Sequence, residues 1–167
     1  MNSTEEIIEQ WKNQDANSKI KIKQFLNDFK SVPEEELMTI LEEENSTVFN
    51  QFDCLQCANC CKTTPPIFLK SDVKRISKSL NIPPKIFIKK YLIEDIDGTL
   101  IGNGVPCRFL KEDNSCDIYE VRPEACQGFP HMDEKGFKHR NDLNLKNTLI
   151  CPIALRIVEN VKSRLLA

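Results

Sequence analysis

Half of the cysteines in this chain lie in one short stretch, Cys54-Leu55-Gln56-Cys57-Ala58-Asn59-Cys60-Cys61. Two residues between successive thiols let the backbone curl so that both sulfur atoms reach one metal ion, as in zinc knuckles and iron–sulfur loops. The chain has 167 residues and eight cysteines in all. The stretch therefore predicts a fold that is organised around thiolate ligands to a metal.

The other four cysteines are spread over the C-terminal half, so their metal-binding partners must come from elsewhere in the fold. Cys60 and Cys61 are adjacent, and adjacent side chains generally point in different directions. We therefore expect two groups of ligands. The first group is Cys54, Cys57, Cys60 and Cys151, and the second is Cys61, Cys107, Cys116 and Cys126.

Zinc and iron are the two candidate metals. The C-x2-C-x2-C spacing of Cys54, Cys57 and Cys60 is that of ferredoxin loops and favours iron, for which a 4Fe–4S cluster is one form. Eight thiols also divide into two tetrahedral four-cysteine sites, which is the arrangement of structural zinc.

Composition excludes several classes of protein. The chain has 23 Lys plus Arg against 25 Asp plus Glu, so it has no excess charge that would hold a phosphate backbone or an anionic membrane. No apolar run approaches the roughly 18 residues of a membrane span, and the first residues do not form a secretion signal. We expect a cytoplasmic protein with no membrane partner, in which thiols stay reduced and bind metal rather than form disulfides.

The hydrophobic pattern predicts a mostly α fold with a minor β-hairpin, organised around a cysteine-bound metal centre. Residues 1–52 form a helical arm packed on the core, with a break near 13–18, a capping box at Ser3 and Glu6 and a second helix that begins at Ser31–Pro33. Residues 53–167 form the cysteine-cluster domain, in one compact unit with the arm. The predicted helices of this domain begin at Ser71, Pro83, Pro123 and Pro152. Between them, residues 98–104 are predicted to form a loop and residues 128–140 an irregular segment. Residues 107–110 and 116–119 are predicted to pair as a small hairpin.

The two predicted helices after Ser71 and Pro83 form a helical hairpin. Lys62–Lys90 carries eight bases and one acid, and Lys85, Lys89 and Lys90 lie on the second helix. A DNA-binding helix-turn-helix would have this pattern, but so would two solvated helix faces in ordinary helical packing. We favour ordinary packing and do not expect nucleic acid as a partner.

Three residues near the cysteines have both a functional and an ordinary interpretation. Arg122 could offset the charge of a thiolate cluster, although an ion pair with a carboxylate is the simpler expectation. His131 could be a spare metal ligand or proton carrier, or simply exposed. Asp53 could be an oxygen ligand for iron, or an acid that meets water.

The cysteines stand in a series of linked motifs: Cys54-x2-Cys57-x2-Cys60-Cys61, Cys107-Arg-Phe-Leu, Cys116-Asp-Ile-Tyr-Glu, Arg122-Pro-Glu-Ala-Cys126, Phe129-Pro130 and Cys151-Pro152. From Asp53 onward the chain resembles the YkgJ-type cysteine-cluster family (CxxCxxCC) of zinc- or iron-chelating proteins. The resemblance implies a small cytosolic protein that chelates metal through these cysteines. Gln127 departs from the pattern, since relatives tend to have arginine there.

Three functions compete. The leading prediction is a metal-binding module with no catalytic residues that the sequence identifies, and with an unidentified protein as one candidate partner. A metal-dependent redox or protein-modifying enzyme is the alternative, because a related cysteine cluster is found in flagellin lysine methylases; such an enzyme would need an open metal position. A metal- or redox-responsive DNA-binding regulator is the third.

Overall fold

Prolines and polar caps set the helix boundaries in the computed structural model, which describes residues 4–166. The predicted break in the first helix is confirmed: α1 (Thr4–Lys12) and α2 (Ala16–Asp28) are separate, because the Asp15 carboxylate accepts a hydrogen bond from the Ser18 N–H and caps α2. Ser3 lies outside the described residues, so the capping box at Ser3 and Glu6 stays a prediction. After the 3₁₀ turn η1 (Phe29–Ser31), α3 (Glu34–Phe49) has Pro33 as its N-cap residue, so the helix begins directly after the start predicted at Ser31–Pro33.

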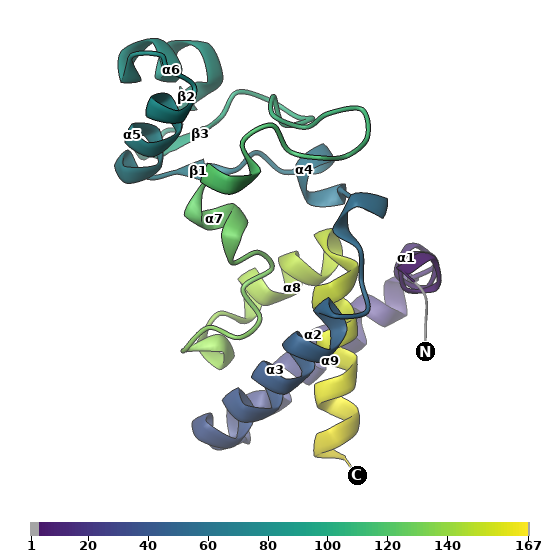
Figure 1. Ribbon diagram of the computed structural model, residues 1–167. Coiled ribbons are helices and arrows are strands. Elements are labelled where there is room, and N and C mark those ends of the chain that lie inside the picture. The colour runs from purple at the N-terminus through teal and green to yellow at the C-terminus, as the bar shows by residue number, and fades with distance from the viewer. Residues whose placement is uncertain (1–3, 167) are drawn as a thin grey trace. The chain divides into compact units, whose positions relative to one another are not determined.

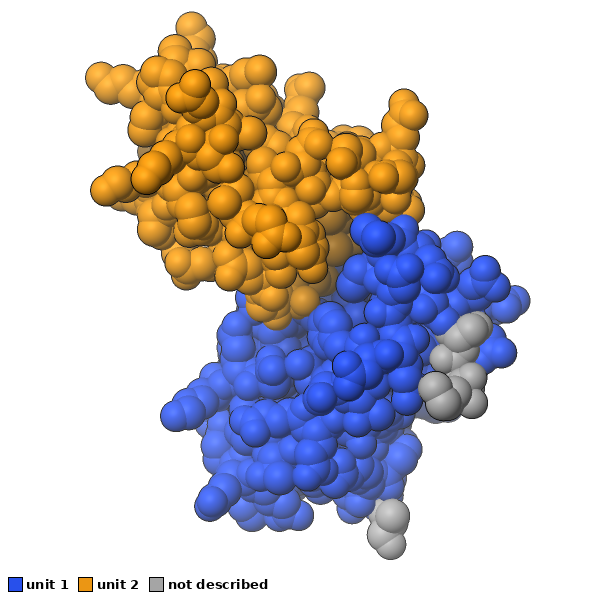
Figure 2. Space-filling model, viewed as in Figure 1, with its two compact units in different colours: residues 1–56, 130–167 blue, residues 57–129 orange. Residues whose placement is uncertain are grey.

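The chain forms two compact units, which Figure 2 shows in different colours. Unit 1 contains residues 1–56 and 130–167, and unit 2 contains residues 57–129. Within the described residues, 130–166 thus pack with 4–56 and not with the segment that precedes them in sequence. The predicted division into an arm (1–52) and a cysteine-cluster domain (53–167) stays a prediction about how the chain folds.

Unit 1 is built around the last helix, α9 (Pro152–Leu165), which contacts α1, α2, α3 and α8. Most of its apolar side chains are almost completely buried, among them Ala154, Ile157, Val158 and Val161, whereas Leu165 is only partly buried. Part of the segment before it is more regular than predicted, because η4 (Phe137–His139) and α8 (Asn141–Ile150) follow Gly136. The prediction of an irregular segment over 128–140 is therefore wrong at its end, where buried Phe137 packs against Phe29.

Unit 2 contains a three-stranded antiparallel sheet in the order β1-β3-β2 (Figure 1). The strands are β1 (Ile67–Phe68), β2 (Leu92–Glu94) and β3 (Leu100–Gly102). The loop predicted over 98–104 is wrong where β3 forms, since runs of two or three residues are too short to show strand alternation. The predicted hairpin at 107–119 is reduced to one antiparallel bridge between Leu110 and Cys116.

Two helices pack beside this sheet as the predicted helical hairpin, α5 (Lys70–Ser79) and α6 (Pro84–Tyr91). Aromatic rings fill the core of the unit: Phe87 is fully buried and lies 5.9 Å from Phe68 and 6.2 Å from Phe109, centroid to centroid. A smaller helix, α7 (Glu124–Gln127), follows the 3₁₀ turn η3 (Tyr119–Val121). The mostly α fold with minor β structure is confirmed.

None of the helices in residues 4–166 combines the length and apolar character that crossing a bilayer requires.

Candidate metal centre

The cysteine-rich stretch folds as two short turns. Cys54 lies in the 3₁₀ turn η2 (Cys54–Gln56) at the end of unit 1, and it is exposed. The Asp53 carboxylate accepts a hydrogen bond from the Leu55 N–H at 2.9 Å, so Asp53 caps this turn. Cys57 begins unit 2, and Ala58 then adopts a left-handed conformation (φ 50°), which turns the chain into α4 (Asn59–Thr63).

Cys60 and Cys61 lie side by side on α4, with their sulfur atoms 4.0 Å apart. Two thiolates on one tetrahedral zinc, each with a bond of about 2.3 Å, would be roughly 3.8 Å apart. This distance therefore suits two thiols on one ion as well as two thiols on neighbouring centres.

Cys107 and Cys116 are held next to α4 and to each other by backbone contacts. The Cys107 N–H donates to the Cys61 carbonyl at 2.7 Å. Cys116 forms the bridge with Leu110, closed by a hydrogen bond from the Lys111 N–H to the Ser115 carbonyl at 2.9 Å. Three thiol-bearing segments that are up to 55 positions apart in sequence thus meet in unit 2.

Backbone N–H groups affect the ionisation of two of the thiols. Burial raises the pKa of Cys107 and Cys116, and backbone hydrogen bonds from Phe109 and Leu110 to Cys107 and from Ile118 to Cys116 partly oppose this effect. Such N–H groups stabilise a negatively charged sulfur and tune metal-bound thiolates. The donor set and its backbone surroundings therefore fit a thiophilic metal such as zinc or iron.

Cys126 is positioned by α7, and α7 is tied to α5 by a residue that the sequence analysis missed. The Asp72 side chain is fully buried and accepts hydrogen bonds from the backbone N–H groups of Leu69 (2.9 Å) and Glu124 (3.2 Å) and from the guanidinium of Arg75 (2.6 Å). Arg75 also donates to the Arg122 carbonyl at 2.8 Å. One carboxylate thus caps the starts of both α5 and α7, and its hydrogen bond with Glu124 joins positions 52 apart. The position of Asp72, three residues after Leu69, is a sequence signal for the cap of α5. No residue near Asp72 in sequence indicates that it also caps α7.

The thiols of unit 2 influence one another's ionisation. Burial raises the pKa of Cys107, Cys116 and Cys126, and the nearby Cys61 thiol raises all three further. The pKa of Cys126 reaches about 12, with Cys107 and Cys116 contributing. Contact with Cys60, followed by burial, raises the pKa of Cys61. As placed in residues 4–166, no three Cys, His, Asp or Glu side chains are close enough to hold one metal ion, so metal binding requires the thiol side chains to move closer together.

Cys151 is the N-terminal cap residue of α9, as expected from Cys151-Pro152. Its side chain is buried. It belongs to unit 1 together with Cys54, whereas Cys57 and Cys60 belong to unit 2. The first predicted ligand group, Cys54, Cys57, Cys60 and Cys151, stays a prediction.

Arg122 does not form the expected ion pair within the described part of the chain. It donates to the Tyr119 carbonyl at 2.7 Å, and its guanidinium carbon lies 4.0 Å from the centre of the Tyr119 ring. Its charge lowers the pKa of Cys126, although less than burial and the other thiols raise it. Arg122 therefore favours a thiolate at Cys126.

His131 has a left-handed backbone (φ 59°), and its Nδ1 lies 2.6 Å from the Glu134 carboxylate. The same carboxylate accepts a hydrogen bond from Arg140 at 2.6 Å. These contacts give His131 a local role in unit 1, where it fixes the turn between Pro130 and η4.

The raised pKa of Cys126 predicts how the metal-free protein responds to pH. A pKa that is higher in the folded state favours folding while the thiol is protonated. That contribution is complete below pH 9 and is lost as the pH rises through about 12. We expect the free energy of unfolding of the metal-free, reduced wild type to fall as the pH rises across this interval. This fall should be steeper than that of the Cys126→Ser variant by up to about 1.4 kcal/mol per pH unit. Urea denaturation of both proteins between pH 8 and 11 measures this difference, and parallel pH profiles would contradict it.

Comparison with known proteins supports the interpretation of the cysteines. Neither the curated proteins nor the solved structures include a match to this chain. A family model does match, over residues 53–152, and its description is "CxxCxxCC: Putative zinc- or iron-chelating domain". The matched segment spans more than half of the chain and contains all eight cysteines, from Cys54 to Cys151. The protein therefore belongs to the CxxCxxCC family, whose domain is associated with chelation of zinc or iron.

Proposed function

We propose that this protein is a cytoplasmic metal-binding module in which Cys61, Cys107, Cys116 and Cys126 form one thiolate site. The observation that carries the proposal is the meeting of these cysteine-bearing segments within unit 2, where the backbone of Cys107 bonds to Cys61 and all three other thiols influence Cys126. Clustered cysteines that serve as metal ligands are typical of the reducing cytosol, which supports the proposed location.

The proposed second site is the one predicted from spacing, with Cys54, Cys57, Cys60 and Cys151 as ligands. The C-x2-C-x2-C run supports iron there, with a 4Fe–4S cluster as the favoured form. Zinc in either site would cross-link the fold, whereas an iron–sulfur cluster would add electron transfer.

A single shared centre is the competing arrangement, and the 4.0 Å distance between the Cys60 and Cys61 sulfur atoms favours it. In this arrangement the two thiols would bind the same ion or bridge two adjacent ions. The two arrangements differ in the expected effect of removing one thiol. Removal should release all of the metal from a shared centre, but only part of the metal from two separate sites.

Anaerobic purification, followed by analysis of zinc, iron and acid-labile sulfide, tests the proposal. In Cys61→Ser we expect loss of one site's metal while the other is retained, and Cys54→Ser, the matched change in the first group, should show the converse. Circular dichroism verifies that both variants are folded. Loss of all metal in folded Cys61→Ser would establish a shared centre, and absence of bound zinc and iron from the wild type would refute metal binding.

Metal uptake should release protons, because the raised thiol pKa values keep these ligands protonated at pH 7 in the metal-free protein. Zinc titration into metal-free protein is therefore expected to release about four protons per four-thiolate site. Calorimetry in two buffers of different ionisation enthalpy measures this number. Release of about one proton per zinc would contradict a four-thiolate site.

A further inference from the structure

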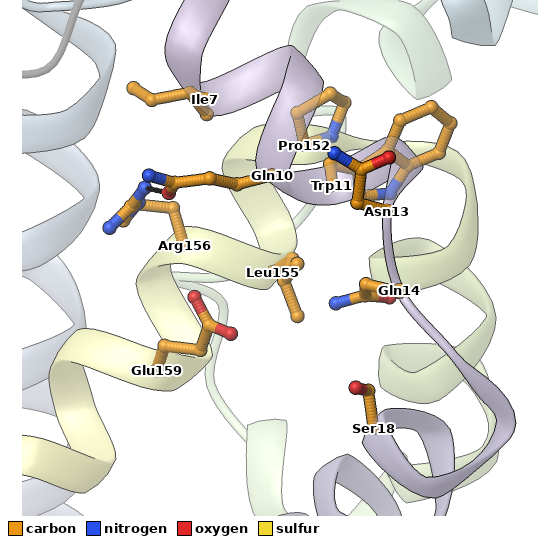
Figure 3. A pocket seen from close by; sticks show the side chains of 10 residues that line it. All are labelled: Ile7, Gln10, Trp11, Asn13, Gln14, Ser18, Pro152, Leu155, Arg156 and Glu159. Carbon is orange, nitrogen blue, oxygen red and sulfur yellow. Dashed lines mark hydrogen bonds between the residues drawn. The ribbon is translucent and has the colours of Figure 1, made fainter.

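Unit 1 contains a cavity that the cysteine sites do not explain. It lies between α9 and the end of α1 with the connection to α2, and its volume is about 270 Å³ (Figure 3). Ligand pockets usually have roughly 300 to 1,000 Å³. The cavity is therefore suited to a molecule smaller than a nucleotide.

One part of the wall is apolar and rigid. Ile7, Pro152 and Leu155 are buried and line it together with the Trp11 ring. The Trp11 indole N–H donates to the Thr148 carbonyl at 2.9 Å, which fixes the ring. This surface can accept an apolar group, and a fixed indole can also attract a cation.

Two opposite charges lie on the α9 side of the cavity. Arg156 and Glu159 are three residues apart, so they lie on the same face of the helix. They do not pair with each other, because the Arg156 guanidinium donates to the Gln10 side-chain oxygen.

Glu159 is exposed at the rim of the cavity, and its carboxylate forms no hydrogen bond or ion pair with residues 4–166. Desolvation by its neighbours raises its pKa despite the charges of Arg156 and Lys162. Lys162 is engaged elsewhere, with its ammonium 3.4 Å from the centre of the Phe25 ring. An unpaired carboxylate at the edge of a cavity is a receptor for a cation.

Neutral polar groups line the opposite side. Figure 3 shows the Gln14 amide and the Ser18 hydroxyl pointing toward the space in front of Glu159. These groups can donate to and accept from a polar ligand without adding charge. The wall thus offers one anion, one cation, neutral hydrogen-bonding groups and an apolar patch.

We propose that this cavity binds a free α-amino acid as its zwitterion, with the ammonium at Glu159, the carboxylate at Arg156 and the side chain against Leu155 and Trp11. A zwitterion satisfies both charges at once and leaves no net charge in the cavity. A simple amine would leave Arg156 without an anionic partner, and a simple carboxylate would leave Glu159 without a cation. The proposal is independent of the metal sites.

Fluorescence can test the proposal, because Trp11 is the only tryptophan in the chain. Glycine, L-alanine, L-leucine, L-glutamine and L-lysine are titrated into the full-length, metal-loaded protein, and calorimetry repeats any response. We expect at least one of them to change the emission saturably, with a Kd below about 1 mM. Its methyl ester and its analogue without the amino group should each bind at least about tenfold more weakly, which is about 1.4 kcal/mol.

Glu159→Gln should weaken binding of the responding amino acid at least about tenfold, because an amide cannot neutralise an ammonium. Glu9→Gln is the matched control: Glu9 is exposed on α1 and does not line the cavity, so its affinity should equal that of the wild type. Thermal melting verifies that both variants are folded. No response to any amino acid, an unchanged Kd in Glu159→Gln, or equally tight binding of the methyl ester would each overturn the proposal.

Discussion

Removing the metal is expected to release the segment Asn103–Ile118 from the folded structure of unit 2. This segment carries two of the proposed thiolate ligands, yet it contains no helix or strand beyond the single bridge between Leu110 and Cys116. Structural zinc contributes about 10 to 16 kcal/mol of apparent binding free energy in small domains, as much as the whole stability of a typical domain. Metal binding would therefore add a large free energy to the burial of Phe109 and Ile118 in ordering the segment.

Hydrogen exchange measures this effect. After treatment with a strong chelator under reducing conditions, amide exchange in Asn103–Ile118 should accelerate at least about 100-fold, which corresponds to about 2.7 kcal/mol. The amides of α3 in unit 1 serve as the internal control and should change much less. Equal protection of Asn103–Ile118 with and without metal, together with an unchanged cooperative melt, would show that the metal does not hold the fold.

The second large effect is expected from Asp72→Ala. Truncation removes a fully buried acceptor from the N–H groups of Leu69 and Glu124 and from Arg75. Removing one partner of a buried pair costs about 3 to 5 kcal/mol, and the partly exposed Arg75 places this case near about 3 kcal/mol. Because Asp72 fixes the start of α7, the variant should also retain less metal in the site that includes Cys126.

Asp113→Ala is the matched control for this change. Asp113 also accepts a backbone hydrogen bond, from Ser115 at 2.9 Å, but it is exposed, so its loss should destabilise the protein much less than the loss of Asp72. Urea denaturation of the metal-loaded proteins measures both costs, and metal analysis compares their stoichiometry. Equal stability of the two variants would show that the Asp72 link between α5 and α7 does not make a large contribution to the stability of the protein.

Local sequence signals predicted most of the helices, because the physics that starts a helix is local. Pro33, Pro84 and Pro152 lie at or next to the first residue of α3, α6 and α9. At α5 the local signal was misleading. Ser71 was the expected cap, whereas Leu69 is the cap residue and the Asp72 carboxylate receives its N–H.

The cysteine spacing by itself determined the family of this protein and its candidate ligands, because the reach of two thiols separated by two residues follows from short-range geometry. Only the tertiary structure decided that residues 130–167 pack with the N-terminal helices, that strands of two or three residues form a sheet, and that Asp72 caps both α5 and α7. The same holds for the backbone bond between Cys107 and Cys61, which joins positions 46 apart. These contacts depend on chain segments that meet only after folding, and a local pattern carries no information about its distant partner.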